Sequence, residues 1–256
     1  MNRIKKLFKE KNENILNVYF TAGHPKLQDT AEIAAALDKN GVDLIELGMP
    51  YSDPLADGLT IQQSSMKALK NGMTLDLLFD QVQKIRSQQD TPIILMGYLN
   101  QVIQYGQKKF LDRCEEIGID GLILPDLPMD IYVQEFQKDL EDRDIVISFL
   151  ITPQTSDDRI KKADELSTGF VYVVSQSSIT GKTGDISDAQ QKYFDRINAM
   201  NLSSPSLIGF GIHDKKTYNV ACTNSNGAII GSAFIRALEG DESIEDKVGQ
   251  FIQSIR

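Results

Sequence analysis

The sequence has no tryptophan, two cysteines and two histidines among its 256 residues. Cys114 and Cys222 lie too far apart in the chain to suggest a disulfide framework or a zinc site, and they suit a reducing cytoplasm. His24 and His213 have no third clustered ligand, so we expect no metal site and treat both as solvated loop residues. Without cysteine or metal chemistry, the candidates for catalysis are carboxylates and tyrosines.

Long hydrophobic runs are also missing. No stretch approaches the roughly 18 uninterrupted apolar residues of a membrane-spanning helix, so no membrane span is expected. The basic N-terminal stretch, residues 1–9, lacks the apolar run and cleavage site of a signal peptide and predicts an amphipathic helix. The net charge of −9 argues against nucleic-acid binding, which needs a basic surface. We therefore expect a cytoplasmic protein.

Short apolar runs alternate with helical patterns along the whole chain. Eight strands, each followed by a helix, predict a parallel sheet, and eight such units in this length predict an α/β fold of the (β/α)8 TIM-barrel type. We expect a single domain over residues 1–256 with extra short helices. A doubly wound open sheet is the alternative, but the glycine-rich turn that it would want after an early strand is missing. The predicted strands are 15–21, 43–48, 92–98, 121–125, 145–151, 169–175, 206–211 and 227–231.

One stretch, residues 44–58, combines a buried strand with three acids. Glu46 interrupts the apolar strand, and Asp53 and Asp57 follow on a loop rich in proline and glycine. A carboxylate in a buried strand must be paired, protonated or directed into a cavity. Two carboxyls in different environments can act as acid and base. From these residues alone, a core ion pair for Glu46 and turn caps for the aspartates remain alternatives to a catalytic role.

The ends of the last three strands carry a second pattern. Gly181, Gly211 and Gly231 lie where backbone can approach a ligand closely, and Ser232 opens a short helix. Barrels often bind a phosphate at the loops after strands seven and eight, so a phosphate site is expected here. Tyr172, at the end of the sixth strand, is equally compatible with a barrel core and with a catalytic role.

The run LIELGMPYSDPLADG resembles the signature of the tryptophan synthase alpha subunit family. The resemblance extends over nearly the whole chain and includes FTAGHP, ILPDLP, YVVSQSSITG, GFGI and IIGSA. It implies a (β/α)8 barrel that cleaves indole-3-glycerol phosphate to indole and glyceraldehyde 3-phosphate by a retro-aldol reaction.

The resemblance also implies residue roles. Glu46 resembles the general acid/base that protonates the indole ring, Asp57 the carboxylate that binds the indole N–H, and Tyr172 the tyrosine beside Glu46. Cleavage needs a proton on a poorly basic ring carbon, so the acid should have a raised pKa. Glu46 on its apolar strand is suited to that, whereas Asp57 on a polar loop should stay ionised. Gly181, Gly211, Gly231 and Ser232 match the phosphate-binding positions, and Phe20, Tyr98, Leu124, Ile151 and Phe210 are candidates for the indole pocket.

The mobile loop of the family departs from its usual pattern here. Gln176 and Ser178 stand where the family more often has Arg and Gly, on the loop that also carries Thr180. In the family, indole passes to a beta subunit that holds pyridoxal phosphate, within an alpha2-beta2 heterotetramer. The resemblance therefore implies a beta-subunit partner and no cofactor in this chain, with the partner surface near Asp126, Pro128 and residues 52–58.

Two other functions remain open from the sequence. One is another phosphate-binding barrel, such as a sugar-phosphate isomerase or aldolase, although no predicted strand carries the lysine that a Schiff-base aldolase needs. The other is a non-catalytic subunit that binds a phosphate ligand and regulates a partner enzyme.

Overall fold

The computed structural model describes residues 1–175, 187–209 and 211–256. Within them, all strand pairs are parallel, and the sheet order is β5-β4-β3-β2-β1-β9-β8-β7-β6. This confirms the predicted parallel α/β architecture. The strands are β1 (Ile15–Thr21), β2 (Leu44–Gly48), β3 (Ile93–Met96), β4 (Gly121–Ile123), β5 (Val146–Ile147), β6 (Leu150–Ile151), β7 (Val171–Val174), β8 (Ser206–Gly209) and β9 (Gly227–Ile230).

The sheet closes through the predicted fifth strand, which the structure divides in two. β5 and β6 lie at the two ends of the sheet order, yet only two residues separate them in the chain. The Ser148 amide donates to Leu122 O of β4 at 3.2 Å, and Phe149 O accepts from the Tyr172 amide of β7 at 2.9 Å. The chain therefore changes partner at this point, and the barrel is complete.

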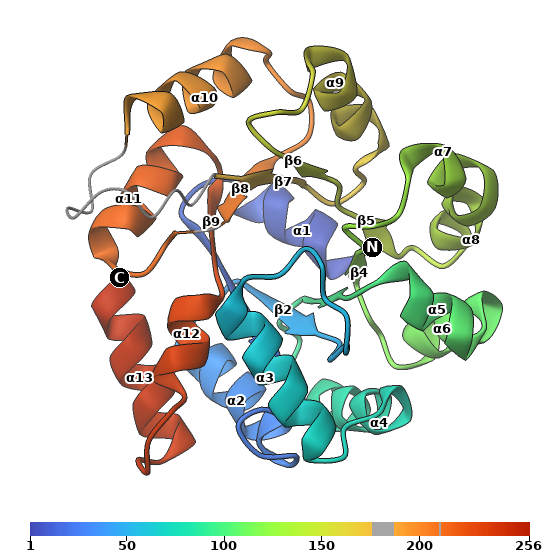
Figure 1. Ribbon diagram of the computed structural model, residues 1–256, viewed down its shortest axis with the longest axis vertical. Coiled ribbons are helices and arrows are strands. Elements are labelled where there is room, and N and C mark those ends of the chain that lie inside the picture. Colours follow the sequence, from blue (N-terminus) through green and yellow to red (C-terminus); the bar gives the residue numbers. More distant parts are fainter. Residues whose placement is uncertain (176–186, 210) are drawn as a thin grey trace.

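Helices surround the ring of strands in Figure 1. Several helices begin at a residue whose side chain caps the first turn. The Thr74 hydroxyl accepts from Leu77 N, and the Ser243 hydroxyl accepts from Asp246 N. The helical segment between residues 129 and 142 contains a short π-helix, Tyr132–Phe136. The helical elements are α1 (Arg3–Glu10), α2 (Asp29–Lys39), α3 (Leu59–Lys70), α4 (Leu75–Arg86), α5 (Leu99–Tyr105), α6 (Gln107–Glu116), α7 (Met129–Ile131), η1 (Tyr132–Phe136), α8 (Gln137–Asp142), α9 (Asp157–Leu166), α10 (Asp188–Ala199), α11 (Lys215–Asn224), α12 (Ser232–Ala237) and α13 (Ile244–Ile255).

Alternation along β1 separates two apolar layers. Ile15 and Tyr19 belong to the cluster inside the barrel, whereas Leu16, Val18 and Phe20 belong to the larger cluster that also includes residues of the surrounding helices. This is the period-two alternation expected when both faces of a strand are buried. The face on which a residue lies decides whether it can reach a cavity at the barrel mouth.

The N-terminal helix α1 covers the opposite end of the barrel. Ile4 belongs to the inner cluster, and the Phe8 ring lies 5.9 Å from the Phe170 ring just before β7. Beneath it, the carboxylate of Asp120 is paired with Arg86 and, at 3.1 Å, with Arg3. The predicted amphipathic helix is thus confirmed, and it closes the barrel at the end away from the strand carboxyl termini (Figure 1).

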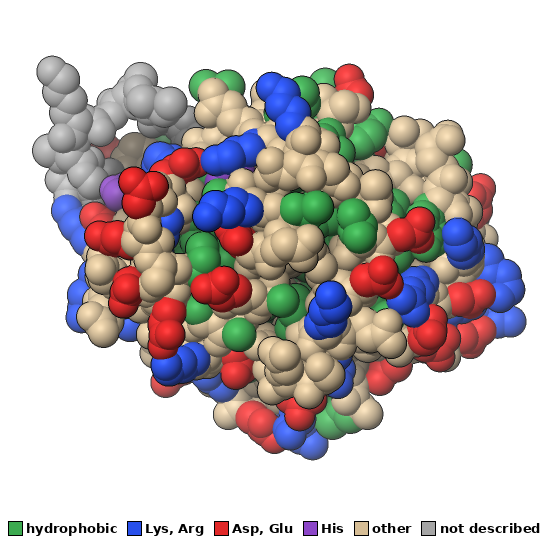
Figure 2. All heavy atoms as spheres, turned by 90° about the horizontal axis from the view of Figure 1, so that it is seen from below, with side chains coloured by type: hydrophobic (Ala, Val, Ile, Leu, Met, Phe, Trp, Pro, Cys, Tyr) green, Lys and Arg blue, Asp and Glu red, His purple; other side chains and the backbone are tan. Residues whose placement is uncertain are grey.

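The surface carries charges of both signs. Figure 2 shows Lys and Arg side chains interspersed with Asp and Glu over one face of the molecule. Among the described residues, no helix is both long enough and apolar enough to cross a membrane.

Candidate active site

A cavity of about 400 Å³ opens at the carboxyl ends of the strands. Its size falls within the usual range for small-molecule sites. Side chains from the barrel interior form its floor, and the segments after β2, β8 and β9 form its walls. Its lining includes Tyr19, Glu46, Asp57, Ile61, Met96, Tyr172, Gly211, Ile212, His213, Ile229, Gly231, Ser232, Ala233 and Arg236.

Glu46 lies at the floor of this cavity, on the interior face of β2, with 1% of its surface exposed. Asn17 of β1 donates from Nδ2 to Glu46 Oε2 at 2.7 Å. Burial raises the pKa of Glu46 to about 8; the Asn17 hydrogen bond opposes this rise, and the nearby negative charge of Asp57 adds to it. Glu46 is therefore mostly protonated at pH 7 and can donate a proton. The core ion pair considered from sequence is not the environment of Glu46 here.

The surroundings of the Asp57 side chain are less polar than its position on a polar loop predicted. Burial raises the pKa of Asp57 to about 6, opposed by a hydrogen bond from Tyr98 Oη to Asp57 Oδ2 at 3.1 Å. The Tyr98 hydroxyl also accepts from Ala56 N at 3.0 Å and so fixes the loop. Because its pKa lies below 7, Asp57 remains mostly ionised at pH 7, whereas Glu46, with the higher pKa, remains mostly protonated. The two carboxyls therefore hold different protonation states in one cavity.

Tyr172 and Tyr19 belong to the floor of the cavity, with Glu46. Burial, with the nearby charge of Glu46, raises the pKa of Tyr172 well above its ordinary value, so this phenol keeps its proton. A Cβ at Gly209 would lie 2.5 Å from the Tyr172 hydroxyl oxygen, so only glycine leaves room for that ring. The Tyr19 hydroxyl lies 3.3 Å from Thr21 Oγ1, and burial also raises its pKa.

The end of the cavity opposite the acids is suited to an anion. Gly211 has a φ of +79°, which favours glycine, and Gly231 with Ser232 leads into α12. Arg236, on the same helix, donates to Thr60 Oγ1 at 3.3 Å and brings a positive charge to the rim. The structure thus gathers three of the four predicted phosphate-binding residues; Gly181 and Thr180 lie outside the described residues, as do Gln176 and Ser178.

The described residues predicted for the indole pocket do not line this cavity. Phe20, Leu124 and Ile151 lie in the cluster between the strands and the helices, outside the residues that line the cavity. Neighbouring residues in a strand face opposite sides, so Tyr19 faces the cavity while Phe20 packs on Phe234. Tyr98 contacts Asp57 and is not among the lining residues, and Phe210 lies outside the described residues.

Sequence reasoning missed Asn17, Tyr19 and Arg236. A signal existed for the first two, because Asn17 and Tyr19 place polar groups two residues apart on one face of an otherwise apolar strand. The cavity is also lined by the apolar residues Ile61, Met96 and Ile229. The hydrophobic pattern of the sequence does not distinguish such residues from ordinary core residues.

His24 was expected on a solvated loop, yet it is 2% exposed. Its Nε2 lies 3.5 Å from Glu239 Oε1, and burial lowers its pKa. The prediction for His24 was therefore wrong, whereas His213 is exposed as expected. Neither histidine belongs to a metal-binding group of three or more His, Cys, Asp or Glu side chains in the part of the chain that the structure describes.

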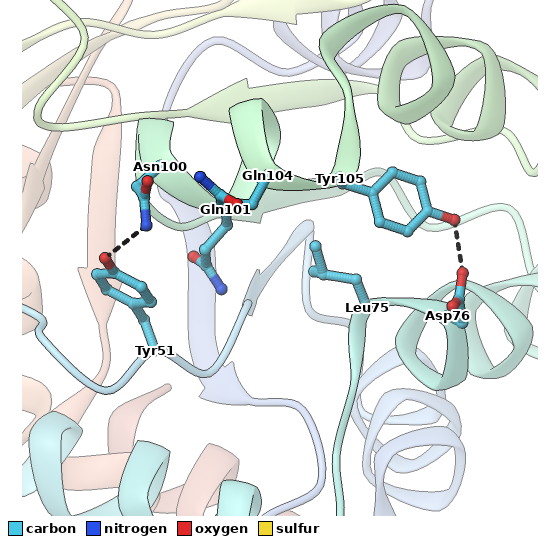
Figure 3. A pocket seen from close by; sticks show the side chains of 7 residues that line it. All are labelled: Tyr51, Leu75, Asp76, Asn100, Gln101, Gln104 and Tyr105. Atoms are coloured by element: carbon cyan, nitrogen blue, oxygen red, sulfur yellow. Dashed lines mark hydrogen bonds between the residues drawn. The ribbon is translucent and has the colours of Figure 1, made fainter.

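A second hollow lies beside the loop that carries Asp57. Figure 3 shows Tyr51 from the loop after β2 pointing toward Asn100 of α5, whose Nδ2 donates to the Tyr51 hydroxyl at 3.0 Å. The Tyr51 ring stacks on the Tyr98 ring at 5.2 Å, and Tyr98 donates to Asp57. Contacts therefore lead from exposed Asn100 to the catalytic candidate Asp57.

Residues 5–255 match the protein family described as Tryptophan synthase alpha chain. The chain belongs to this family. It is 52% identical to the tryptophan synthase alpha chain of Flavobacterium johnsoniae over 256 residues, covering 100% of both chains. The crystal structure of the Legionella pneumophila alpha chain superposes with a TM-score of 0.88 at 30% identity, covering 100% of this chain and 96% of that one. A chain of the tryptophan synthase complex of Pyrococcus furiosus gives 0.86 at 32% identity, covering 96% and 98%.

Proposed function

We propose that this chain cleaves indole-3-glycerol phosphate to indole and glyceraldehyde 3-phosphate, as the alpha subunit of tryptophan synthase in L-tryptophan biosynthesis. It is a carbon–carbon lyase. The observation that carries this proposal is the pair of carboxyls, Glu46 and Asp57, in one cavity with pKa values of about 8 and about 6.

Glu46 is the general acid and then the base. Its proton passes to C3 of the indole ring, which supplies a π electron pair for the new C–H bond and becomes cationic. The bond between C3 and the glycerol carbon then breaks, and its electron pair returns to the ring. The hydroxyl-bearing carbon becomes the aldehyde as its hydroxyl proton returns to the Glu46 carboxylate. A pKa of about 8 suits a group that must both give and take this proton near neutral pH.

Asp57 stabilises the cationic intermediate. Its carboxylate accepts the indole N–H, whose positive charge increases when C3 is protonated, so this interaction is stronger in the transition state than in the bound substrate. Tyr98 holds Asp57 through the hydrogen bond to Oδ2. Tyr172, which keeps its proton, packs beside Glu46 and orients the substrate.

The phosphate group is held at the other end of the cavity by Gly211, Gly231 and Ser232, with Gly181 as the fourth position that the resemblance implies. Arg236 adds a positive charge at the rim. The apolar ring lies between, against Tyr19, Ile61 and Met96. Binding the phosphate away from the breaking bond fixes the ring against Glu46.

A beta subunit that holds pyridoxal phosphate is the partner, in an alpha2-beta2 assembly, and this chain needs no cofactor of its own for proton transfer. The partner surface includes residues 52–58, Asp126 and Pro128. Exposed apolar side chains lie on the adjoining segments, with Leu55 95% and Ile103 55% exposed. A cytoplasmic location, with no nucleic-acid or membrane partner, completes this proposal.

Asp126 is a poor test of that surface, because its Oδ1 accepts Leu99 N at 2.9 Å and so fixes the start of α5. Ile103→Glu is sharper, with Leu77→Glu on α4, 38% exposed, as the matched control. We expect only Ile103→Glu to weaken activation by the beta subunit. Equal activation of both variants would place the partner elsewhere.

The function itself is tested by mixing the purified chain with indole-3-glycerol phosphate and following glyceraldehyde 3-phosphate, with and without a beta subunit. Release that increases with the partner supports the lyase. Absence of release in both conditions, with a phosphate ligand still bound, would favour the non-catalytic regulatory subunit instead.

A further inference from the structure

Asn17 is a polar side chain in the barrel interior, and its contacts concern Glu46. It is fully buried on β1, between Leu44 of β2 and Ile229 of β9 in the strand register. Its Nδ2 donates to Glu46 Oε2 at 2.7 Å, while its own Oδ1 has no hydrogen-bond partner among the described residues. A buried amide that leaves one group unsatisfied costs stability, so packing alone gives no reason for an asparagine here.

The same hydrogen bond makes the two oxygens of Glu46 unequal. Oε2 accepts from Asn17, whereas Oε1 has no hydrogen-bond partner within the described part of the chain. In a protonated carboxyl, the oxygen that accepts a hydrogen bond acts as the carbonyl oxygen, and the other carries the proton. The amide of Asn17 also restricts the rotation of the carboxyl group.

We propose that Asn17 is a positioning residue for the cleavage reaction: it binds Oε2 of Glu46 and thereby makes Oε1 the oxygen that carries the proton to C3 of the indole ring and takes one back. This inference rests on the proposed function. Because Asn17 is not among the residues that line the cavity, it acts through Glu46.

Among the described residues, the titratable groups that face Glu46 are Asp57 from the loop after β2, Tyr19 from β1 and Tyr172 from β7. Asp57 repels a negative charge on Glu46, and both tyrosines keep their protons. The Asn17 hydrogen bond opposes burial by stabilising the carboxylate form of Glu46, which lowers its pKa.

The test uses Asn17→Asp, which keeps the shape of the side chain but removes the N–H donor, and Asn17→Leu, which removes both polar groups. Loss of a hydrogen bond to the carboxylate should raise the pKa of Glu46 by about one to two units. We expect the basic limb of the kcat profile to move up by about that amount in Asn17→Leu, and by at least that amount in Asn17→Asp, whose new carboxyl also repels the carboxylate form of Glu46. We expect kcat at pH 7 to fall about tenfold, because a carboxyl with a higher pKa gives up its proton less readily and its orientation is lost, with KM little changed.

Ser148→Ala is the matched control. Ser148 is another buried polar residue, between β5 and β6, and its Oγ accepts from Phe170 N at 3.2 Å, so its loss should lower stability without moving the pH profile. A ¹³C-NMR titration of the Glu46 carboxyl in the free protein supplies a readout independent of catalysis, and we expect an upward shift of its pKa in both Asn17 variants.

The outcomes separate the two proposals. A wild-type chain that does not cleave the substrate contradicts the proposed function, while the NMR titration still tests whether Asn17 controls Glu46. Wild-type pH profiles and an unshifted Glu46 titration in Asn17→Asp would overturn the inference and leave Asn17 as a packing residue. If Asn17→Leu does not fold, the variant of equal size, Asn17→Asp, decides the result.

Discussion

The dependence of the rate on pH follows from the two carboxyls. The proposed mechanism requires Glu46 protonated, with a pKa of about 8, and Asp57 ionised, with a pKa of about 6. One pH unit from its pKa, an acid is about 90% in the favoured form. At pH 7 both groups are therefore mostly in the active state. The rate should fall about tenfold from this maximum at pH 9, as Glu46 loses its proton, and about tenfold at pH 5, as Asp57 gains one.

The assay is the initial rate of glyceraldehyde 3-phosphate release from pH 5 to pH 9.5, analysed as kcat/KM. The phosphate group of the substrate also titrates near pH 6, so the acidic limb needs its own control. Asp57→Asn removes the carboxylate, and any acidic limb that remains in its residual activity belongs to the substrate. A basic limb near pH 4 to 5 in the wild type would refute the raised pKa of Glu46. A full acidic limb in Asp57→Asn would show that Asp57 is not the group that titrates there.

Three further substitutions test other parts of the structure. Gly209→Ala should lower kcat/KM about tenfold in the cleavage assay, because the new Cβ would lie 2.5 Å from the Tyr172 hydroxyl and displace the ring. Arg236→Ala should raise KM about fivefold with kcat nearly unchanged, because Arg236 lines the end of the cavity where the proposed function places the phosphate, away from the reacting bond. Arg86→Ala should lower the free energy of unfolding in urea by about 3–5 kcal/mol, because it removes one of the two cations paired with buried Asp120.

Each of these has a result that would contradict it. Gly249→Ala is the control for the first, since a Cβ there meets only ordinary contacts, and equal kinetics in both glycine variants would count against a role for the Tyr172 position. A fall in kcat without a change in KM for Arg236→Ala would indicate that Arg236 acts on the bond-breaking step and not on phosphate binding. An unfolding midpoint equal to wild type for Arg86→Ala would show that Arg3 alone satisfies Asp120.

Much of the barrel could be predicted from the sequence because apolar runs of strand length alternate with helical periods. The division of the strand over 145–151 could not, since it depends on where the chain changes neighbours, from β4 to β7. Glu46 and Asp57 could be found because acids are unusual in and after a buried strand. Phe20 was preferred to Tyr19 because both faces of β1 are buried, and only the polar groups of Asn17 and Tyr19 mark the inner face.

The pKa of Asp57 illustrates the same limit at the site. Its loop is polar in composition, yet the side chain is folded against Tyr98 and largely removed from water, which only the three-dimensional structure reveals. Asn17 was overlooked for a related reason, because its partner is 29 positions away in the sequence. Polar pairs of this kind become apparent only after the strand register is known.

The central claim is that Glu46 transfers the proton, and one comparison tests it most directly. Cleavage of indole-3-glycerol phosphate by Glu46→Gln is measured beside the wild type, together with binding of a non-cleavable phosphate analogue to both proteins. We predict that Glu46→Gln binds the analogue as tightly as the wild type and releases no glyceraldehyde 3-phosphate above background. Cleavage by Glu46→Gln at a rate near that of the wild type would contradict the account.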